Sequence, residues 1–297
     1  MPLSRSSTAL QPAPAAPVRR GPAQHLPAAR PTDEHSRYQT DLPQPGAATR
    51  RVRDQLTGPS RHGRVIHVGD DAVYVQIRDR CIGLLSSNAV HVPCGIRTIA
   101  GATAARVSVG DPAATGHGRL QVAGLVVVVA RLVELDIPWS IEDAERAHAD
   151  LLADGPVRTT ELPAEALVGL TAGDPDSVGS LLGRGSGLTP LGDDVLSGWL
   201  VTARCVGHPG LESVAGRIGQ LARRTTTLSA ELLRCACDGE APPPLRIVLA
   251  ALAAGDRAAL ARAIDGLRAV GHTSGTGLLL GCRLAVAGVA TGAEVAG

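Results

Sequence analysis

The chain has 297 residues, of which 44% are hydrophobic and 1% aromatic, and its formal net charge is +1. This length is enough for one large or two modest hydrophobic cores, and the near-neutral charge argues against nucleic acid as a partner. All 29 basic residues are arginine. The absence of lysine excludes a Schiff base, a lysine general base and a Walker-type phosphate loop.

The cysteines and the apolar runs indicate where the protein works. The six cysteines show no Cys-x-x-Cys spacing, so we expect buried free thiols and no metal cluster built from them. The longest apolar run, residues 122–130, is too short to span a bilayer, and the opening residues lack the apolar stretch of a signal peptide. The sequence therefore predicts a soluble, cytoplasmic chain with no membrane partner.

The first 60 residues differ in composition from the rest. They hold ten of the 21 prolines and show no apolar periodicity. Such a segment buries too little apolar surface to offset the entropy cost of ordering it. We predict that residues 1–60 form a disordered tail rich in Pro, Ala and Arg.

A β-rich domain is predicted over residues 61–138. Apolar and polar residues alternate on both sides of the turn at 69–71, which is typical of a hairpin. Residues 126–129 are apolar on both faces, so we expect them in the central strand of an antiparallel sheet or barrel. Short strands are predicted at residues 65–68, 73–77, 82–85, 104–109 and 120–130.

An all-α domain is predicted over residues 139–297, which makes the fold class α+β. Ser140 and Asp143 resemble a capping box that opens the first helix, at 140–153. Further helices are predicted at residues 163–170, 175–182, 190–206, 210–223, 228–238, 243–253, 256–269 and 276–290.

A glycine-rich loop enters the helix predicted at 190–206. Its sequence, residues 183–194, reads Gly-Arg-Gly-Ser-Gly-Leu-Thr-Pro-Leu-Gly-Asp-Asp. We expect Thr189 to cap the helix and Pro190 to occupy its first position. The closely spaced glycines permit positive φ angles, and the free N–H groups of a helix start favour an anion. The loop therefore predicts an anion-binding site.

Two aspartates at the end of this loop conflict with a bound anion. At a separation of about 5 Å and a dielectric constant of about 20, a carboxylate and a phosphate repel each other by roughly 3 kcal/mol. The loop should bind an anion only if Arg184 or a cation offsets Asp193 and Asp194, or if the carboxylates point away. A Mg²⁺ ion held by these carboxylates is one hypothesis, and a simple role in the first helical turn is the other.

Two later segments also place hydroxyl groups at predicted helix starts. Residues 223–229 carry Thr226 and Ser229, and residues 271–277 carry Ser274 and Gly275. If the three helix starts converge, they form a pocket rich in hydrogen-bond donors for a phosphate or a carboxylate, flanked by arginines. The alternative is that these residues are ordinary helix caps.

Established catalytic patterns do not account for the loop. It lacks the last glycine of Gly-x-Gly-x-x-Gly and follows a helix, which excludes a dinucleotide site. Ser186 lacks the Gly-x-Ser-x-Gly frame of a nucleophile elbow. His272 is a candidate acid or base, and a satisfied, partly buried histidine is the alternative.

The three segments together resemble the landmark motifs of the family that includes the AllH subunit of oxamate carbamoyltransferase. The family's first motif reads Gly-x-Gly-Pro-Gly-Leu-Thr-Pro-Ser-Gly-Asp-Asp, and the resemblance extends over about residues 62–290. It implies a small β-rich part before a helical part, and partner subunits in anaerobic allantoin (purine) breakdown. The implied reaction cleaves oxalurate with phosphate to give oxamate and carbamoyl phosphate.

The sequence departs from the family pattern at three positions. Ser186 stands in place of Pro, Leu191 in place of Ser, and Gly277 where an Asp is expected. The second and third changes remove a hydroxyl and a carboxylate. They indicate that the substrate of this chain differs from that of its relatives or that its activity is reduced.

Our leading hypothesis is a carbamoyltransferase subunit that binds carbamoyl phosphate or an anion like oxamate or oxalurate. Asp193, Asp194 and His272 are the candidate catalytic residues, and the two aspartates are also the candidate Mg²⁺ ligands. Two alternatives are a non-catalytic assembly or ligand-binding protein of a multi-subunit complex, and a stand-alone metal-assisted hydrolase of a phosphorylated or amide substrate. The candidate ligand-binding residues are Arg184, Gly185, Ser186, Gly187, Thr189, Thr226, Ser229, Ser274 and Gly275.

Overall fold

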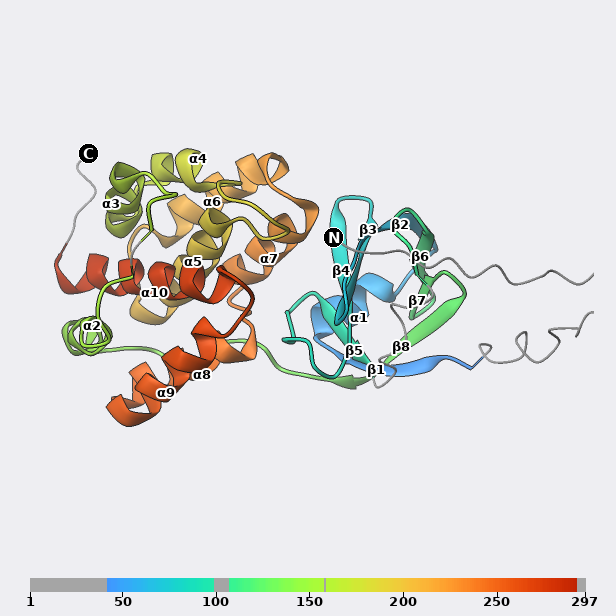
Figure 1. Ribbon diagram of the computed structural model, residues 1–297, viewed down its shortest axis with the longest axis horizontal. Helices are drawn as coiled ribbons and strands as arrows, with labels where there is room; N and C mark the ends of the chain where they lie inside the picture. The colour runs from blue at the N-terminus through green and yellow to red at the C-terminus, as the bar shows by residue number, and fades with distance from the viewer. Residues whose placement is uncertain (1–41, 99–106, 158, 293–297) are drawn as a thin grey trace, which may run out of the picture. The chain divides into compact units, whose positions relative to one another are not determined.

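The computed structural model describes residues 42–98, 107–157 and 159–292. It has a closed eight-stranded β-barrel followed by a helical region (Figure 1), which confirms the predicted α+β class. Most of the predicted tail, residues 1–41, lies outside the described residues. Within them, no helix has the length and apolarity needed to cross a membrane.

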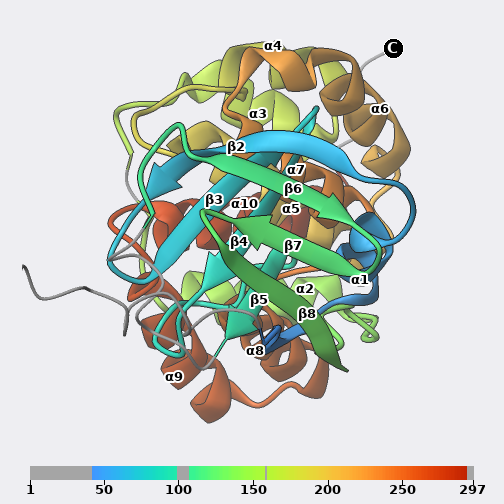
Figure 2. The same cartoon turned by 90° about the vertical axis from the view of Figure 1, so that its right-hand side faces the viewer.

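The barrel closes in the order β1-β5-β4-β3-β2-β6-β7-β8, and Figure 2 faces its strands. Most neighbours are antiparallel, but β1 pairs in parallel with β8 and β4 in parallel with β5. The predicted hairpin is confirmed, with Val65 opposite Val75. The strands are β1 (Gln44–Ala48), β2 (Arg61–Val68), β3 (Ala72–Ile77), β4 (Arg80–Leu85), β5 (Gly95–Thr98), β6 (Pro112–Gly116), β7 (Arg119–Val122) and β8 (Leu125–Leu132).

The predicted tail extends too far, because ordered structure begins well before residue 60. Strand β1 closes the barrel, and helix α1 (Arg50–Leu56) follows it directly. Thr49 caps this helix, and Val52 and Leu56 are buried in the barrel core. The segment was assigned to the tail because prolines flank it and its apolar residues are few.

The long strand predicted at 120–130 is divided by a turn. Ala123 and Gly124 adopt positive φ angles of 47° and 86°, so β7 ends before them and β8 begins after them. Strand β8 is not a central strand, since a closed barrel has neither centre nor edge, and its last three residues are exposed. Of the strand predicted at 104–109, residues 104–106 lie outside the described residues and 107–109 form no strand. Strands β5 and β6 were not predicted.

The helical region follows the predicted elements closely. The segment predicted as a helix at 175–182 is a 3₁₀ turn followed by one short helix. The first helix begins at Ala144 and is capped by Asp143, so the expected capping box at Ser140 is absent. The helices are α2 (Ala144–Leu152), α3 (Ala164–Ala172), α4 (Val178–Leu181), α5 (Leu191–Val206), α6 (Leu211–Leu221), α7 (Thr227–Cys237), α8 (Pro243–Ala254), α9 (Arg257–Arg268) and α10 (Ser274–Ala290).

Helices α5 and α10 pack closely at the centre of the helical core. A Cβ atom at Gly198 would lie 2.2 Å from the carbonyl oxygen of Leu278, and one at Gly281 would lie 2.0 Å from that of Val195. Atoms this close would clash, so the two helix backbones touch directly. The fully buried Trp199 belongs to the same core.

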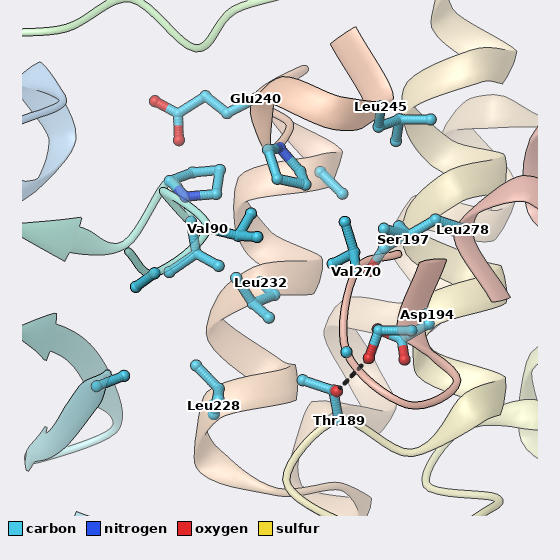
Figure 3. Close-up of a pocket in the computed structure, with 18 of the residues that line it drawn as sticks. Val90, Thr189, Asp194, Ser197, Leu228, Leu232, Glu240, Leu245, Val270 and Leu278 are labelled. Carbon is cyan, nitrogen blue, oxygen red and sulfur yellow. Dashed lines mark hydrogen bonds between the residues drawn. The ribbon is translucent and has the colours of Figure 1, made fainter. Parts of the chain in front are cut away.

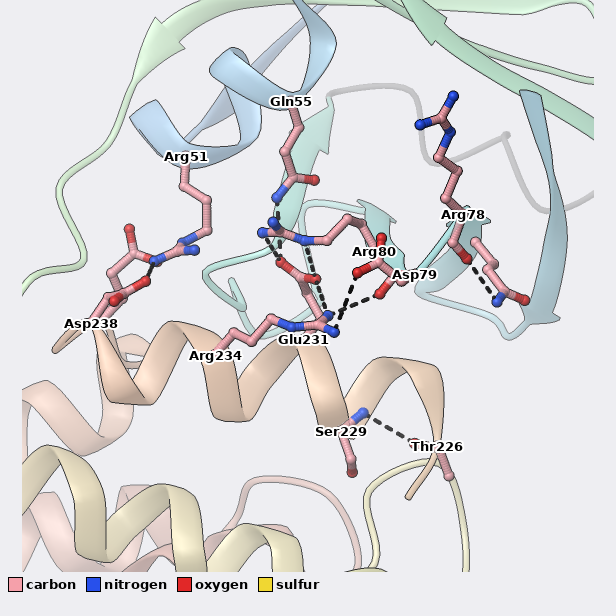
Figure 4. A network of polar contacts seen from close by, with 12 residues as sticks. Arg51, Gln55, Arg78, Asp79, Arg80, Thr226, Ser229, Glu231, Arg234 and Asp238 are labelled. Carbon is pink, nitrogen blue, oxygen red and sulfur yellow. Dashed lines mark hydrogen bonds and ion pairs between the residues drawn. The ribbon is translucent and has the colours of Figure 1, made fainter. Parts of the chain in front are cut away.

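Helix α7 connects the helical region to the barrel through buried charge. Glu231, fully buried, accepts hydrogen bonds at 2.7 Å from both Nε and Nη2 of Arg80 in β4, as Figure 4 shows. Three buried thiols pack at the same interface: Cys81, Cys94 and Cys235. All six cysteines are free, as predicted. The predicted domain boundary at residue 138 falls between β8 and α2.

We predict that Gly198→Ala and Gly281→Ala each lower the free energy of unfolding by about 1–3 kcal/mol, because the added methyl group overpacks the α5–α10 contact. The control is Gly216→Ala in α6, where nothing lies within 4 Å of the added Cβ atom. That change should raise stability by roughly 0.5–1 kcal/mol through helix propensity. Urea unfolding measures all three variants, and equal effects would contradict the proposed close contact.

Candidate functional site

The glycine loop adopts the positive φ angles predicted for it, but the hydroxyl of Thr189 does not cap the helix as expected. Gly183, Gly185 and Gly187 have φ angles of 73°, 117° and 89°. Helix α5 begins at Leu191, and its cap position is Pro190, which offers no side-chain hydrogen bond. Thr189 is therefore not the helix cap. Its hydroxyl lies 2.9 Å from the hydroxyl of Ser274, at the start of α10.

The three motifs converge, as the hypothesis of a shared pocket required. The Thr189–Ser274 contact joins the first motif to the third. The hydroxyl of Thr226 donates to the carbonyl oxygen of Leu188 at 2.6 Å and joins the second motif to the first. Ser229 is buried, and its N–H donates to Thr226 at 3.0 Å, which caps α7. Thr226 is thus both a helix cap and a bridge between motifs.

Asp193 is bound by the loop that precedes it. The N–H of Gly183 donates to its Oδ1 at 2.7 Å, and the hydroxyl of Thr225 donates to its Oδ2. Burial raises the pKa of Asp193, and these two hydrogen bonds act against that rise. The carboxyl group of Asp193 therefore uses the hydrogen-bond donors of Gly183 and Thr225, which are then not free to bind an external anion.

Asp194 has a different environment, although it is the next residue in the helix. Its side chain is buried, and its Oδ2 has no hydrogen-bond partner among the described residues. Its pKa is raised from 3.8 to about 7, chiefly by burial and also by the charge of Asp193, while hydrogen bonds from the hydroxyls of Ser274 and Thr189 oppose the rise. Near neutral pH this carboxyl group exists in both protonation states.

Asp194 faces a cavity of about 500 Å³, drawn in Figure 3. Thr189, Ser197 and Ser274 line the same end, whereas Glu240 lies at the opposite end. Apolar side chains from α7, α10 and the loop between β4 and β5 form the wall between the two ends. The cavity therefore combines one polar end inside the helical region with an apolar middle that the barrel helps to close.

The predicted counter-charge for the aspartates is not at this cavity. Arg184 is exposed, its Nε donates to the carbonyl oxygen of Glu161 at 2.8 Å, and it lines a separate groove with Arg224. Among the described residues, neither an arginine nor a histidine lines the cavity of Asp194. Arg223 and Arg224 precede the second motif in sequence, but neither lines the cavity of Asp194.

Several candidate residues also lie outside the cavity lining. Gly185, Ser186 and Gly187 are exposed in the loop, and His272 is exposed in the turn before α10. Gly275 is a packing residue, because a Cβ atom there would lie 1.8 Å from the carbonyl oxygen of Leu267. Of the predicted site residues, Thr189, Asp194 and Ser274 line the cavity. No group of three His, Cys, Asp or Glu side chains suited to a metal occurs within the described ranges.

Two positions that differ from the motif expected from the resemblance, Leu191 and Gly277, lie beside each other, and Gly277 lies against Asp194. A Cβ atom at Gly277 would lie 2.7 Å from the Cβ of Asp194 and 3.1 Å from the Cδ1 of Leu191. The side chain of Leu191 thus borders the space that any side chain at position 277 would need. The absence of polar side chains at positions 191 and 277 is consistent with the raised pKa of Asp194.

Sequence reasoning missed Ser197, Glu240 and the barrel residues that line the cavity. Ser197 lies one turn after Asp194, and this spacing could have indicated it. Val90 and its neighbours belong to a loop of the barrel that no motif marks, so only the packing of the barrel on the helices reveals their role.

Comparison with known proteins agrees with the motifs. A family model described as oxamate carbamoyltransferase subunit AllH matches residues 181–286. This segment contains all three motifs and most of the helical core, so the resemblance inferred from the motifs is confirmed there. The barrel lies outside the matched segment. No solved structure matches the chain.

We predict that Asp193 and Thr225 stabilise the protein as a coupled pair. Asp193→Asn should lower the free energy of unfolding by about 2–3 kcal/mol, because a buried charged hydrogen bond is lost. A double-mutant cycle with Thr225→Val should give a coupling energy of about 1–2 kcal/mol. The exposed pair Ser86 and Asp71, bonded at 2.7 Å, serves as control and should show coupling near zero. Additive effects at Asp193 and Thr225 would contradict the contact.

We also predict that Asp194→Asn stabilises the protein at alkaline pH. The pKa of Asp194 is raised on folding, so its favourable contribution is complete below pH 3.8 and is lost as pH rises through about 7. At pH 8 the variant should exceed the wild type by up to about 4 kcal/mol, at 1.36 kcal/mol per pKa unit. Near pH 4 the difference should vanish.

Urea unfolding from pH 4 to 8 measures this effect, and Asp265→Asn, at an exposed position of α9, is the matched control. The free energy of unfolding of the Asp265→Asn control should equal that of the wild type at every pH. A variant at Asp194 that is less stable than the wild type at pH 8 would show that the buried carboxyl group is satisfied by its surroundings.

Proposed function

We propose that this chain is a subunit related to that of oxamate carbamoyltransferase and that it binds the amide end of its substrate at Asp194. The observation that carries the proposal is the buried carboxyl group of Asp194, one oxygen of which has no partner within the described part of the chain, at the polar end of a cavity where the three motifs converge. Unpartnered buried polar groups are costly and are typical of functional sites.

The chemistry of a protonated carboxyl group suits an amide. It offers one donor and one acceptor side by side, and a primary amide offers the same pair in reverse order. The hydroxyls of Thr189, Ser197 and Ser274 line the same end and each can donate or accept. These groups can orient a carbamoyl or oxamoyl amide and exclude water from it.

The cavity suits an amide better than carbamoyl phosphate. A phosphate dianion requires arginines or free N–H groups, whereas the ionisable groups that line the cavity include Asp194 and Glu240 and, among the described residues, no arginine. We therefore assign phosphate binding to partner subunits of the complex. Mg²⁺ is not assigned to Asp193, because both of its oxygens accept hydrogen bonds from the protein.

The inward orientation of Asp194 favours this proposal over a purely structural subunit. A helix connection or docking loop gains nothing from a buried carboxyl group with an oxygen that has no partner among the described residues, because ionisation of this group destabilises the folded state progressively as the pH rises toward its raised pKa. A hydrolase with His272 as base is less favoured, because His272 is exposed and does not line the cavity.

We predict that oxamate binds about tenfold more tightly at pH 6 than at pH 8. Oxamate carries a carboxylate, which ionised Asp194 repels, and the protonated fraction of a group with a pKa of about 7 falls about tenfold between these pH values. Binding at pH 8 should take up a proton. Isothermal titration calorimetry in two buffers of different ionisation enthalpy, with partner subunits present, measures both quantities.

Asp194→Asn should abolish the pH dependence, because its amide keeps a donor and an acceptor at every pH. Asp194→Leu, which has neither, should weaken oxamate binding at pH 6, whereas Asp265→Asn should reproduce the wild type. A pH dependence retained in Asp194→Asn, or unchanged affinity of the Asp194→Leu variant at pH 6, would overturn the proposal. Tighter binding at pH 8 than at pH 6 would overturn it as well, because it would show that the charged carboxylate is the binding form.

A further inference from the structure

We infer that the substrate of this chain carries an uncharged apolar body behind its amide group, and that this body fills the middle of the cavity between Asp194 and Glu240. The inference builds on the proposed binding of the amide at Asp194. It specifies the substrate class: an N-substituted urea or amide larger and less polar than oxamate.

The size of the cavity is the first reason. A cavity of about 500 Å³ lies within the range of about 300–1,000 Å³ that accommodates drug-sized ligands. Oxamate has only a handful of non-hydrogen atoms and would leave most of this volume unfilled. A ligand that reaches from the amide site to the far end must therefore have a body of several more atoms.

The wall of the cavity is the second reason. Val90 from the barrel, Leu232 from α7 and Val270 from the turn before α10 lie between the Asp194 end and the Glu240 end in Figure 3. Apolar cavities do not hold water well, because a buried water needs two to four polar partners. Apolar ligand atoms would gain favourable burial along this wall.

Charge is the third reason. The titratable side chains in the lining are Asp71, Tyr74, Asp194 and Glu240, so the ionisable carboxyl groups repel an anionic body. Glu240 does not attract a cation freely, because Nε of Arg51 already donates to it at 2.6 Å. A neutral body meets none of these electrostatic costs.

The polar end itself has few polar groups. Among the described residues that line it, they are the carboxyl group of Asp194 and the hydroxyls of Thr189, Ser197 and Ser274. These groups suit one amide, while a second charged group on the ligand, as in oxamate, gains no partner of opposite charge.

A series of N-alkylureas from methylurea to hexylurea tests the inference on the full chain. Affinity measured by calorimetry at pH 6 should rise about fourfold for each added methylene, the fold-change that corresponds to burying one methylene group in a protein. Hexylammonium and heptanoate, which carry the same six-carbon alkyl chain as hexylurea, should bind at least tenfold more weakly than hexylurea.

The outcomes separate the two proposals. If the short ureas and oxamate bind in an Asp194-dependent manner but affinity does not rise with chain length, the inference fails and the proposed function stands. If affinity rises with chain length but Asp194→Leu, which removes both the donor and the acceptor, has no effect, the proposed function fails and the amide assignment fails with it. Tighter binding of hexylammonium would show a cationic ligand and would overturn the inference.

Variants of Leu232 locate the binding of the body. Leu232→Trp should fill the middle of the cavity, weaken hexylurea binding more than 30-fold and change methylurea binding less than threefold. Ile247→Trp, at an exposed position of α8, is the matched control and should change neither. Leu232→Ala provides a second variant should the larger side chain prevent folding, and it should weaken hexylurea selectively. Unchanged hexylurea binding in both Leu232 variants would overturn the inference.

Discussion

The close contact between α5 and α10 is the constraint on which the site depends. Gly198 and Gly281 bring the two helix backbones together with no side chain between them. Each helix begins at one of the motifs, so this contact also determines how far Thr189 lies from Ser274. Because helices are stiff and the core is closely packed, a change at Gly198, about one turn from Asp194, would move the residues that surround the carboxyl group. The geometry of the candidate site is therefore a consequence of helix packing, and the loop alone does not produce it.

The two adjacent aspartates show how one motif serves both stability and binding. Consecutive helical residues point about 100° apart, so Asp193 turns toward its own loop while Asp194 faces the cavity. The first satisfies the N–H of Gly183 and the hydroxyl of Thr225. The second is buried with an oxygen that has no partner among the described residues, an arrangement whose cost to stability grows as the pH rises from 3.8 to about 7. Proteins retain such costs chiefly where a ligand offsets them, and this is the physical basis for assigning binding to Asp194.

Much of the helical region could be predicted from the sequence, because amphipathic periodicity, glycines and prolines mark helix ends locally. The convergence of the three motifs could be proposed, but the partners of Arg184 and Asp193 could not. Whether the guanidinium group of Arg184 contacts Asp194 or the carbonyl oxygen of Glu161 depends on how helices that are distant in sequence pack together. Strand β1 was missed for a similar reason, since a segment that contains Pro45 and a glycine forms a strand only when the barrel closes around it. Local signals predict elements, whereas long-range packing decides which side chains meet.

The cavity extends beyond the segment that resembles a known family. Asp194, Ser274 and the hydroxyl groups beside them lie within the matched residues 181–286, but Tyr74 and Val90 come from the barrel, outside that match. The barrel is held against the helices by the ion pair of Arg80 with the buried Glu231, and removing one partner of such a pair typically costs about 3–5 kcal/mol. The proposed amide site thus lies wholly within the matched segment, whereas the apolar middle of the cavity combines Leu232 and Val270 from that segment with Val90 from the barrel. A change confined to the loop between β4 and β5 would therefore alter the apolar middle and leave the proposed amide site in place.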